Sequence, residues 1–330
     1  MDKPLLDFGR ARIVKGRGFS IQLPLAERLR AARGFRQAVV KVTGFGRGTR
    51  GVGKAMDYIS RDGALPLEKD SGELIKGRDE QKALIKEWSM DFDGHERSRD
   101  TAQIVFSMPP GSKVEALRKA VRATGERAFP DHEWVFAMHE DRKHPHAHMM
   151  VKMRGKEKGK KLQLRKADLR ELRGLFAEAS REQGVMLAAS PRAARGIGPT
   201  AERQAIYRLR QKGIIPNVER ATVKEILSEA ERGPLQEKPW EKAMRERNER
   251  ERGLYREEAE KLRARAAGKE GQGDPERKET LLHAAHDLEL FATAMPRPKS
   301  RRQAMLEKAQ AKTPEKTKDR TKSQGAELER

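Results

Sequence analysis

The sequence predicts an α+β domain built on a largely antiparallel sheet. Short runs of apolar and β-branched residues alternate with amphipathic helix patterns, in the order strand, helix, helix, strand, helix, strand, strand, helix. The last two strand patterns, 134–138 and 149–153, flank a charged stretch that contains Pro145, which is typical of a hairpin turn. Strands joined by a hairpin are antiparallel, and this favours the α+β class.

The first half of the domain begins with a short helical stretch at 25–32. Residues 38–43 are rich in valine and predict a strand. It ends in a Gly/Arg-rich stretch, 44–51, which we expect to be a flexible loop whose backbone and guanidinium groups can contact phosphates. A helix that includes 55–61 should follow and end near Asp62 and Gly63.

The second half continues with a helical pattern at 79–91. A strand at 101–108 is stopped by Pro109 and Pro110. Ser112 and Glu115 have capping-box spacing and predict a helix over 112–129. After the hairpin, a last helix is expected from Asp168 to the C-cap residue Gly184.

Composition divides the chain into four parts. We expect a basic N-terminal arm at 1–36, the α+β domain at 37–196, a charged helical region at 197–294 and a disordered basic tail at 295–330. Charged residues make up 37% of the chain and aromatic residues only 5%, so part of it should be solvated helix or disordered tail.

The net charge limits the possible partners. There are 72 Lys and Arg residues against 50 Asp and Glu, a net charge of +22, which points to a polyanion and most simply to nucleic acid. An anionic membrane surface is the alternative, but no apolar amphipathic anchor accompanies the charge. The chain has no cysteine, which fits a reducing cytoplasm, and no apolar run long enough for membrane insertion.

The most informative segment is the hairpin turn itself, which holds four of the chain's eight histidines: His139, His144, His146 and His148. Side chains alternate along a strand, so His146 and His148 share a face, and His139 can lie opposite them on the paired strand. Three imidazoles that leave open coordination positions are typical of a catalytic metal site. The alternative is a surface hairpin that happens to be rich in histidine.

Two further polar residues of this segment, Asp141 and His144, are expected to act beside the metal ligands rather than as ligands. Asp141 could accept the outer N–H of a ligand histidine and fix its tautomer. His144 precedes Pro145 and should lie in the turn. There it could contact a metal-binding histidine or the substrate, rather than the metal itself.

A metal site in a basic protein suggests phosphoryl chemistry on nucleic acid, with either water or a side-chain hydroxyl as the nucleophile. The chain has three tyrosines: Tyr58, Tyr207 and Tyr255. Tyr58 lies just beyond the Gly/Arg-rich stretch and near Arg61, which could hold a phosphate beside it. The alternative for Tyr58 is a half-buried helix aromatic, and the residues alone leave these interpretations open.

Three segments in this order resemble the motifs of P-type Mob relaxases, the relaxases of plasmid mobilisation and conjugation. They are Tyr58-Ile59-Ser60-Arg61-Asp62-Gly63, Phe106-Ser107-Met108-Pro109-Pro110-Gly111 and His139-x-Asp141-x-x-His144-Pro145-His146-x-His148. The third motif is highly specific. The resemblance extends from Val39 to Arg195.

The resemblance implies the HUH fold, a central antiparallel sheet with helices on its flanks and a metal site on its face. It implies that Tyr58 attacks one phosphodiester at the nic site of an origin of transfer and stays linked to the 5′ phosphate. By matching position, His139, His146 and His148 would bind Mg²⁺ or Mn²⁺. Asp141 would orient the histidines, Ser107 would contact the DNA end and His144 would assist as a polar neighbour or general base.

Basic residues near these motifs should hold single-stranded DNA through its phosphates. The expected contacts are Arg47, Arg50, Lys54, Arg61 and Lys152.

The same resemblance implies further partners, namely relaxosome accessory proteins and a type IV coupling protein. The tail could then be a secretion signal, or else a non-specific DNA-binding tail, and the protein would be a bacterial cytoplasmic protein that can move into a recipient cell with the DNA. A rolling-circle replication initiator or an HUH transposase would share the chemistry. A nuclease that uses water, or a relaxosome accessory protein without activity, would also fit a basic chain with a histidine cluster.

Overall fold

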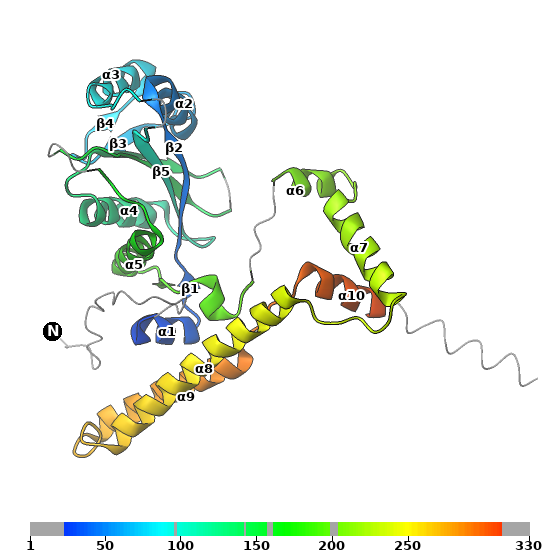
Figure 1. Cartoon of the computed structure of the whole chain (residues 1–330). Helices are drawn as coiled ribbons and strands as arrows, with labels where there is room; N and C mark the ends of the chain where they lie inside the picture. Colours follow the sequence, from blue (N-terminus) through cyan, green and yellow to red (C-terminus); the bar gives the residue numbers. More distant parts are fainter. Residues whose placement is uncertain (1–22, 96–97, 142, 157–160, 199–203, 312–330) are drawn as a thin grey trace, which may run out of the picture. The chain divides into compact units, whose positions relative to one another are not determined.

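The computed structural model describes residues 23–95, 98–141, 143–156, 161–198 and 204–311. The chain divides into two compact units, of which the first ends at Ser190 and the second begins at Pro191. Figure 1 labels the helices and some of the strands. Residues 1–22 of the predicted arm and 312–330 of the predicted tail lie outside the described residues. No described helix is both long and apolar enough to cross a membrane.

A six-stranded antiparallel sheet forms the centre of the first unit, with the strand order β2-β5-β7-β6-β3-β4. The strands are β2 (Val39–Gly46), β3 (Leu67–Lys69), β4 (Leu74–Ile75), β5 (Thr101–Ser107), β6 (Trp134–His139) and β7 (His146–Lys152). Two further short strands, β1 (Arg36–Gln37) and β8 (Leu187–Ala188), pair in parallel. The predicted α+β class is confirmed. The short strands β1, β3, β4 and β8 were not predicted, because two or three residues show no alternation.

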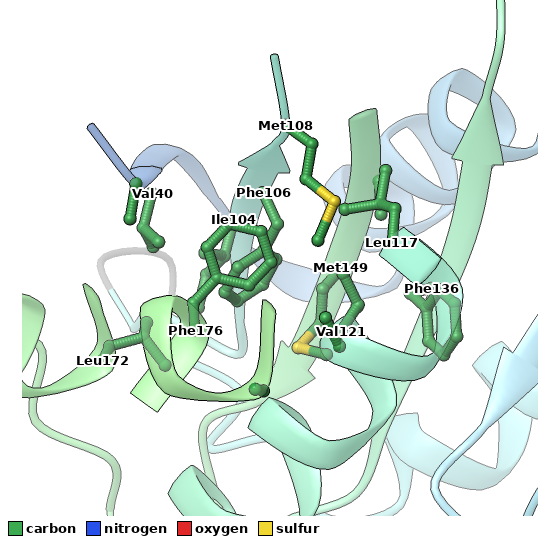
Figure 2. Packing of buried hydrophobic residues seen from close by; sticks show 14 of the residues in the cluster. Val40, Ile104, Phe106, Met108, Leu117, Val121, Phe136, Met149, Leu172 and Phe176 are labelled. Carbon is green, nitrogen blue, oxygen red and sulfur yellow. The ribbon is translucent and has the colours of Figure 1, made fainter. Parts of the chain in front are cut away.

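Helices cover both faces of this sheet. On one face, the apolar side chains of β5 and β7, such as Phe106 and Met149, pack against α4 (Val114–Ala128) and α5 (Lys166–Glu182). Figure 2 shows this core, with Leu117 and Val121 of α4 and Leu172 and Phe176 of α5 turned toward the strands.

The opposite face of the sheet carries Val135, Ala137 and Met150 and packs against α2 (Gly48–Ser60) and α3 (Gly77–Ser89). Alternation along β6 and β7 places His139, His146 and His148 on this second face.

One close contact fixes α4 against the sheet. Gly125 lies over the Trp134 ring, and a Cβ atom at this position would come within 2.8 Å of two ring carbons. Glycine therefore lets the helix approach the strand more closely than any other residue would.

Two local predictions were wrong. The Gly/Arg-rich stretch 44–51 is not a loop, because β2 continues to Gly46 and α2 begins at Gly48. The Gly48 N–H, one of the free donors at the start of a helix, donates to the Asp100 carboxylate at 2.7 Å. Ser112 does not open α4 with a capping box, since the N-cap is Lys113 and no side chain caps it.

The second unit is helical over its described residues. It contains the 3-10 turn η1 (Arg192–Arg195) and the helices α6 (Gln204–Gln211), α7 (Asn217–Ala230), α8 (Pro239–Ala267), α9 (Pro275–Ala294) and α10 (Arg301–Ala311). The helices α8 and α9 pack on each other around fully buried side chains that include Tyr255, Leu262, Leu281 and Leu288. Within the charged helical region, α8 is therefore packed rather than solvated along its apolar stripe, which α9 covers.

The predicted disorder of the tail is also wrong for α10. Arg302 of this helix is buried, and its guanidinium donates to Glu229 at 2.7 Å and to Glu241 at 3.2 Å. These ion pairs connect α10 to Glu229 of α7 and Glu241 of α8.

Candidate metal and tyrosine site

The hairpin of β6 and β7 brings three histidines together. His139 and His146 are directly opposite each other in the strand register, and His148 follows on the same face. The ring centroids lie 4.5 to 5.2 Å apart, and one nitrogen of each ring lies within 4.8 Å of the others. Three converging nitrogen donors fit a divalent cation that keeps open coordination positions.

Backbone carbonyls fix two of these rings. His139 Nε2 donates to the carbonyl oxygen of Ile59 at 2.7 Å, and His146 Nδ1 donates to that of His144 at 3.1 Å. The nitrogen that donates carries the proton, so Nδ1 of His139 and Nε2 of His146 keep their lone pairs for a ligand. Burial lowers the pKa of His139, which keeps its imidazole neutral as metal binding requires.

The end of α2 lies against this cluster. Ile59 is in the last turn of the helix, where carbonyl groups lack partners within the helix, and His139 supplies the missing donor. Arg61 and Asp62 follow with φ of 55° and 58°, a conformation that residues other than glycine adopt rarely. The chain turns sharply here, and the Arg61 side chain reaches Asp141 beyond β6.

Asp141 pairs with Arg61 in the structure. Its carboxylate accepts from Arg61 Nη2 at 2.6 Å, and this ion pair lowers the pKa of Asp141. The same Arg61 nitrogen lies 3.5 Å from His139 Nδ1. The carbonyls of Ile59 and His144 orient the rings of His139 and His146, and sequence reasoning missed them because backbone contacts leave no residue-type signal.

Tyr58 extends from α2 beside the histidines. Its ring is perpendicular to that of His148, with the centroids 5.5 Å apart. The residue is 64% exposed, so the alternative of a half-buried aromatic is wrong. Of the other two tyrosines, Tyr255 is fully buried and Tyr207 is exposed, and both belong to the second unit.

Ser107 and His144 border the cluster. Ser107 is opposite His146 in the register of β5 and β7, and its hydroxyl lies 3.4 Å from the carbonyl oxygen of Pro145. The His144 side chain is exposed and is outside the group of converging nitrogens, and this residue contributes its backbone carbonyl.

Most of the predicted DNA contacts lie along α2. Arg47, Arg50, Lys54 and Tyr58 are exposed and recur at intervals of three or four residues, which puts them on one side of the helix. Within the described part of the chain, the three cations form no ion pair. They form an open basic stripe that leads to Tyr58.

Lys152 does not belong to this stripe. Its side chain is buried, and its ammonium group donates to Asp91 and Glu133, both at 2.6 Å. Two carboxylates neutralise the charge and exclude phosphates, so the predicted DNA contact at Lys152 is wrong.

Comparison with known proteins bears on the same residues. Residues 58–185, which include Tyr58 and the three histidines, match the family described as "Relaxase: MobA/VirD2-like, nuclease domain". The chain is 29% identical to the T-DNA border endonuclease VirD2 of Rhizobium radiobacter over 172 residues, which is 46% of this chain and 40% of the relative. The VirD2 proteins of Rhizobium rhizogenes and Agrobacterium fabrum are also 29% identical, over 43% and 46% of this chain. The matched part covers 40% or less of each relative's length.

Proposed function

We propose that this chain, whose residues 58–185 match the MobA/VirD2-like relaxase nuclease domain, is a relaxase that nicks one strand of DNA by transfer to Tyr58. The observation that carries the proposal is the position of Tyr58, an exposed phenol in contact with a ring of a three-histidine cluster. A nuclease that uses water needs no tyrosine at this position.

In the proposed reaction, the Tyr58 hydroxyl oxygen attacks the phosphorus of the scissile phosphodiester and releases its proton to solvent. The bond between phosphorus and the 3′ oxygen breaks, and that oxygen takes up a proton to become a free 3′ hydroxyl. The 5′ part of the strand remains on Tyr58 as a phosphotyrosine ester. Because one phosphodiester replaces another, the reverse reaction can reseal the strand.

His139, His146 and His148 would hold a divalent cation, which supplies Lewis-acid stabilisation of the charge on the phosphate oxygens. Three imidazoles and no carboxylate suit Mn²⁺ better than Mg²⁺, which prefers oxygen ligands. Arg61, whose Nη2 lies 3.5 Å from His139 Nδ1 and pairs with Asp141, would contact the same phosphate.

The remaining residues would position the strand. Arg47, Arg50 and Lys54 would bind phosphates along α2, and Ser107 would contact the DNA end beside His146. The substrate would be single-stranded DNA at an origin of transfer, handled with relaxosome accessory proteins and a type IV coupling protein.

A covalent-adduct assay tests the proposal. The protein is incubated with Mn²⁺ and single-stranded oligonucleotides that tile the inverted repeats near its own gene, and the products are separated on a denaturing gel. A protein–DNA adduct that Tyr58→Phe abolishes is expected, and Tyr207→Phe, which removes another exposed tyrosine, should retain it. Cleavage without an adduct would indicate a water nuclease, and no cleavage of any oligonucleotide would favour an accessory protein.

A further inference from the structure

A second basic surface lies in the first unit, away from α2. It is a groove of about 750 Å³ formed by three turns, at 33–36, 109–113 and 183–186. Its lining contains three cations, Arg33, Arg36 and Lys113, and no acidic residue.

Strand pairing puts this groove at the same end of the sheet as the histidines. Ser107, the last residue of β5, pairs with His146, and the turn 109–113 follows directly. Val39, the first residue of β2, pairs with Ser107 from the other side, and the turn 33–36 precedes it by a few residues. The turn 183–186 directly precedes β8, and β8 pairs with β1, which follows the turn 33–36.

Two of the cationic side chains in the groove are available to bind an anion. Arg36 and Lys113 are exposed and have no ion pair within the described residues. Other arginines near α4 are neutralised: Arg122 contacts Glu68, and Arg127 contacts Glu182 at 2.9 Å. Arg36 and Lys113 therefore present positive charge that no carboxylate of the described residues offsets.

The groove also offers apolar surface and approachable backbone. Phe35 and Val185 line it, and Met186 is 53% exposed. Gly111 and Gly184 have φ of 82° and 78°, and no atom lies within 4 Å of a Cβ placed on either. Cations for phosphates beside apolar side chains for bases are typical of a surface that binds single-stranded nucleic acid.

We infer that this groove binds the single-stranded DNA that flanks the scissile phosphodiester, with phosphates on Arg36 and Lys113 and a base against Met186. The inference rests on the proposed relaxase function, because it assigns the path of the same substrate. The turn 33–36 lies before the region 58–185 that matches the relaxase family.

The test measures binding without cleavage. In the full chain with Tyr58→Phe, affinity for a fluorescein-labelled 20-nucleotide oligo(dT) is measured as a function of salt. Each lost phosphate contact lowers the slope of log K against log salt by about 0.7, so Arg36→Glu with Lys113→Glu should lower it by about 1.4 and weaken binding about 10-fold at 0.1 M salt. The matched control is Lys82→Glu with Lys86→Glu, which reverses two exposed charges on α3 and should leave the slope unchanged.

A second measurement locates the DNA. Met186 is replaced by the photocrosslinking residue p-benzoylphenylalanine, and irradiation should link it to oligo(dT) unless Arg36→Glu and Lys113→Glu are also present. The inference would be overturned if Arg36→Glu with Lys113→Glu left the salt slope unchanged, or if the α3 control weakened DNA binding as much. The absence of a crosslink at position 186 would also overturn it. Because this assay measures binding in a Tyr58→Phe protein that cannot form the adduct, a groove that binds DNA in a protein whose wild type forms no adduct would refute the proposed function alone.

Discussion

His139 has two roles that substitution can separate. Its Nε2 donates to the carbonyl of Ile59 at the end of α2, and its Nδ1 is available to a metal. His139→Ala removes both groups. His139→Gln removes the imidazole but keeps an amide N–H that can donate to the carbonyl.

The expected magnitudes follow from burial. Ile59 is 1% exposed and His139 is 3% exposed, so alanine leaves a buried carbonyl without a donor. An unsatisfied buried acceptor costs about 1–3 kcal/mol. Loss of the ring's packing adds to this, and we expect His139→Ala to lower the free energy of unfolding by roughly 2–4 kcal/mol. His139→Gln should lower it by about 1 kcal/mol or less, since the hydrogen bond is kept.

Tryptophan fluorescence during urea unfolding in EDTA measures this difference in the first unit. Trp88 and Trp134 are buried there, whereas Trp240 of the second unit is 56% exposed and should change little on unfolding. Calorimetry with Mn²⁺ should show that both variants lose metal binding. Equal stability of the two variants would refute the reasoning, because the carbonyl contact would then contribute nothing to the end of α2.

Three further predictions concern packing, charge and pH. Gly125→Ala should lower the free energy of unfolding by about 1–3 kcal/mol, because its Cβ would overlap the Trp134 ring, and unchanged urea unfolding would contradict this packing. Lys152→Ala should lower the free energy of unfolding of the first unit by about 1–3 kcal/mol, a limited loss because the two carboxylate partners of Lys152 are partly exposed. The same variant should leave the salt dependence of DNA binding unchanged. A smaller salt slope would show that Lys152 contacts a phosphate after all. A histidine in the unfolded chain has a pKa near 6.5, and burial lowers the pKa of His139 in the folded protein. Below about pH 6.5 the unfolded state therefore binds more protons than the folded state. The metal-free protein should lose stability as the pH falls through about 6.5. The Tm in EDTA should therefore fall less in His139→Gln than in the wild type between pH 7.5 and 5.5, and equal falls would exclude His139 as the source.

Local patterns in the sequence determined much of the fold. The apolar strand pattern at 134–138, the hairpin after it and the two-residue spacing of His146 and His148 predicted that His139, His146 and His148 would share a face, and the strand register agrees. Helical spacing predicted α3, α4 and α5 within a few residues of their bounds. These features depend on neighbours in the chain, which set the side of a strand or helix on which each residue lies.

Tertiary structure decided which groups meet. Tyr58 reaches His148, Arg61 pairs with Asp141 and Lys152 is neutralised by Asp91 and Glu133, although these partners are far apart in the chain. The basic groove likewise exists only because β1 pairs with β8 and gathers three separate turns. Periodicity gives the direction of a side chain within its own element, whereas its partner depends on how distant elements pack. The sequence by itself thus determined a histidine hairpin and a basic chain, and only packing put the tyrosine beside the histidines and paired Lys152 with two carboxylates.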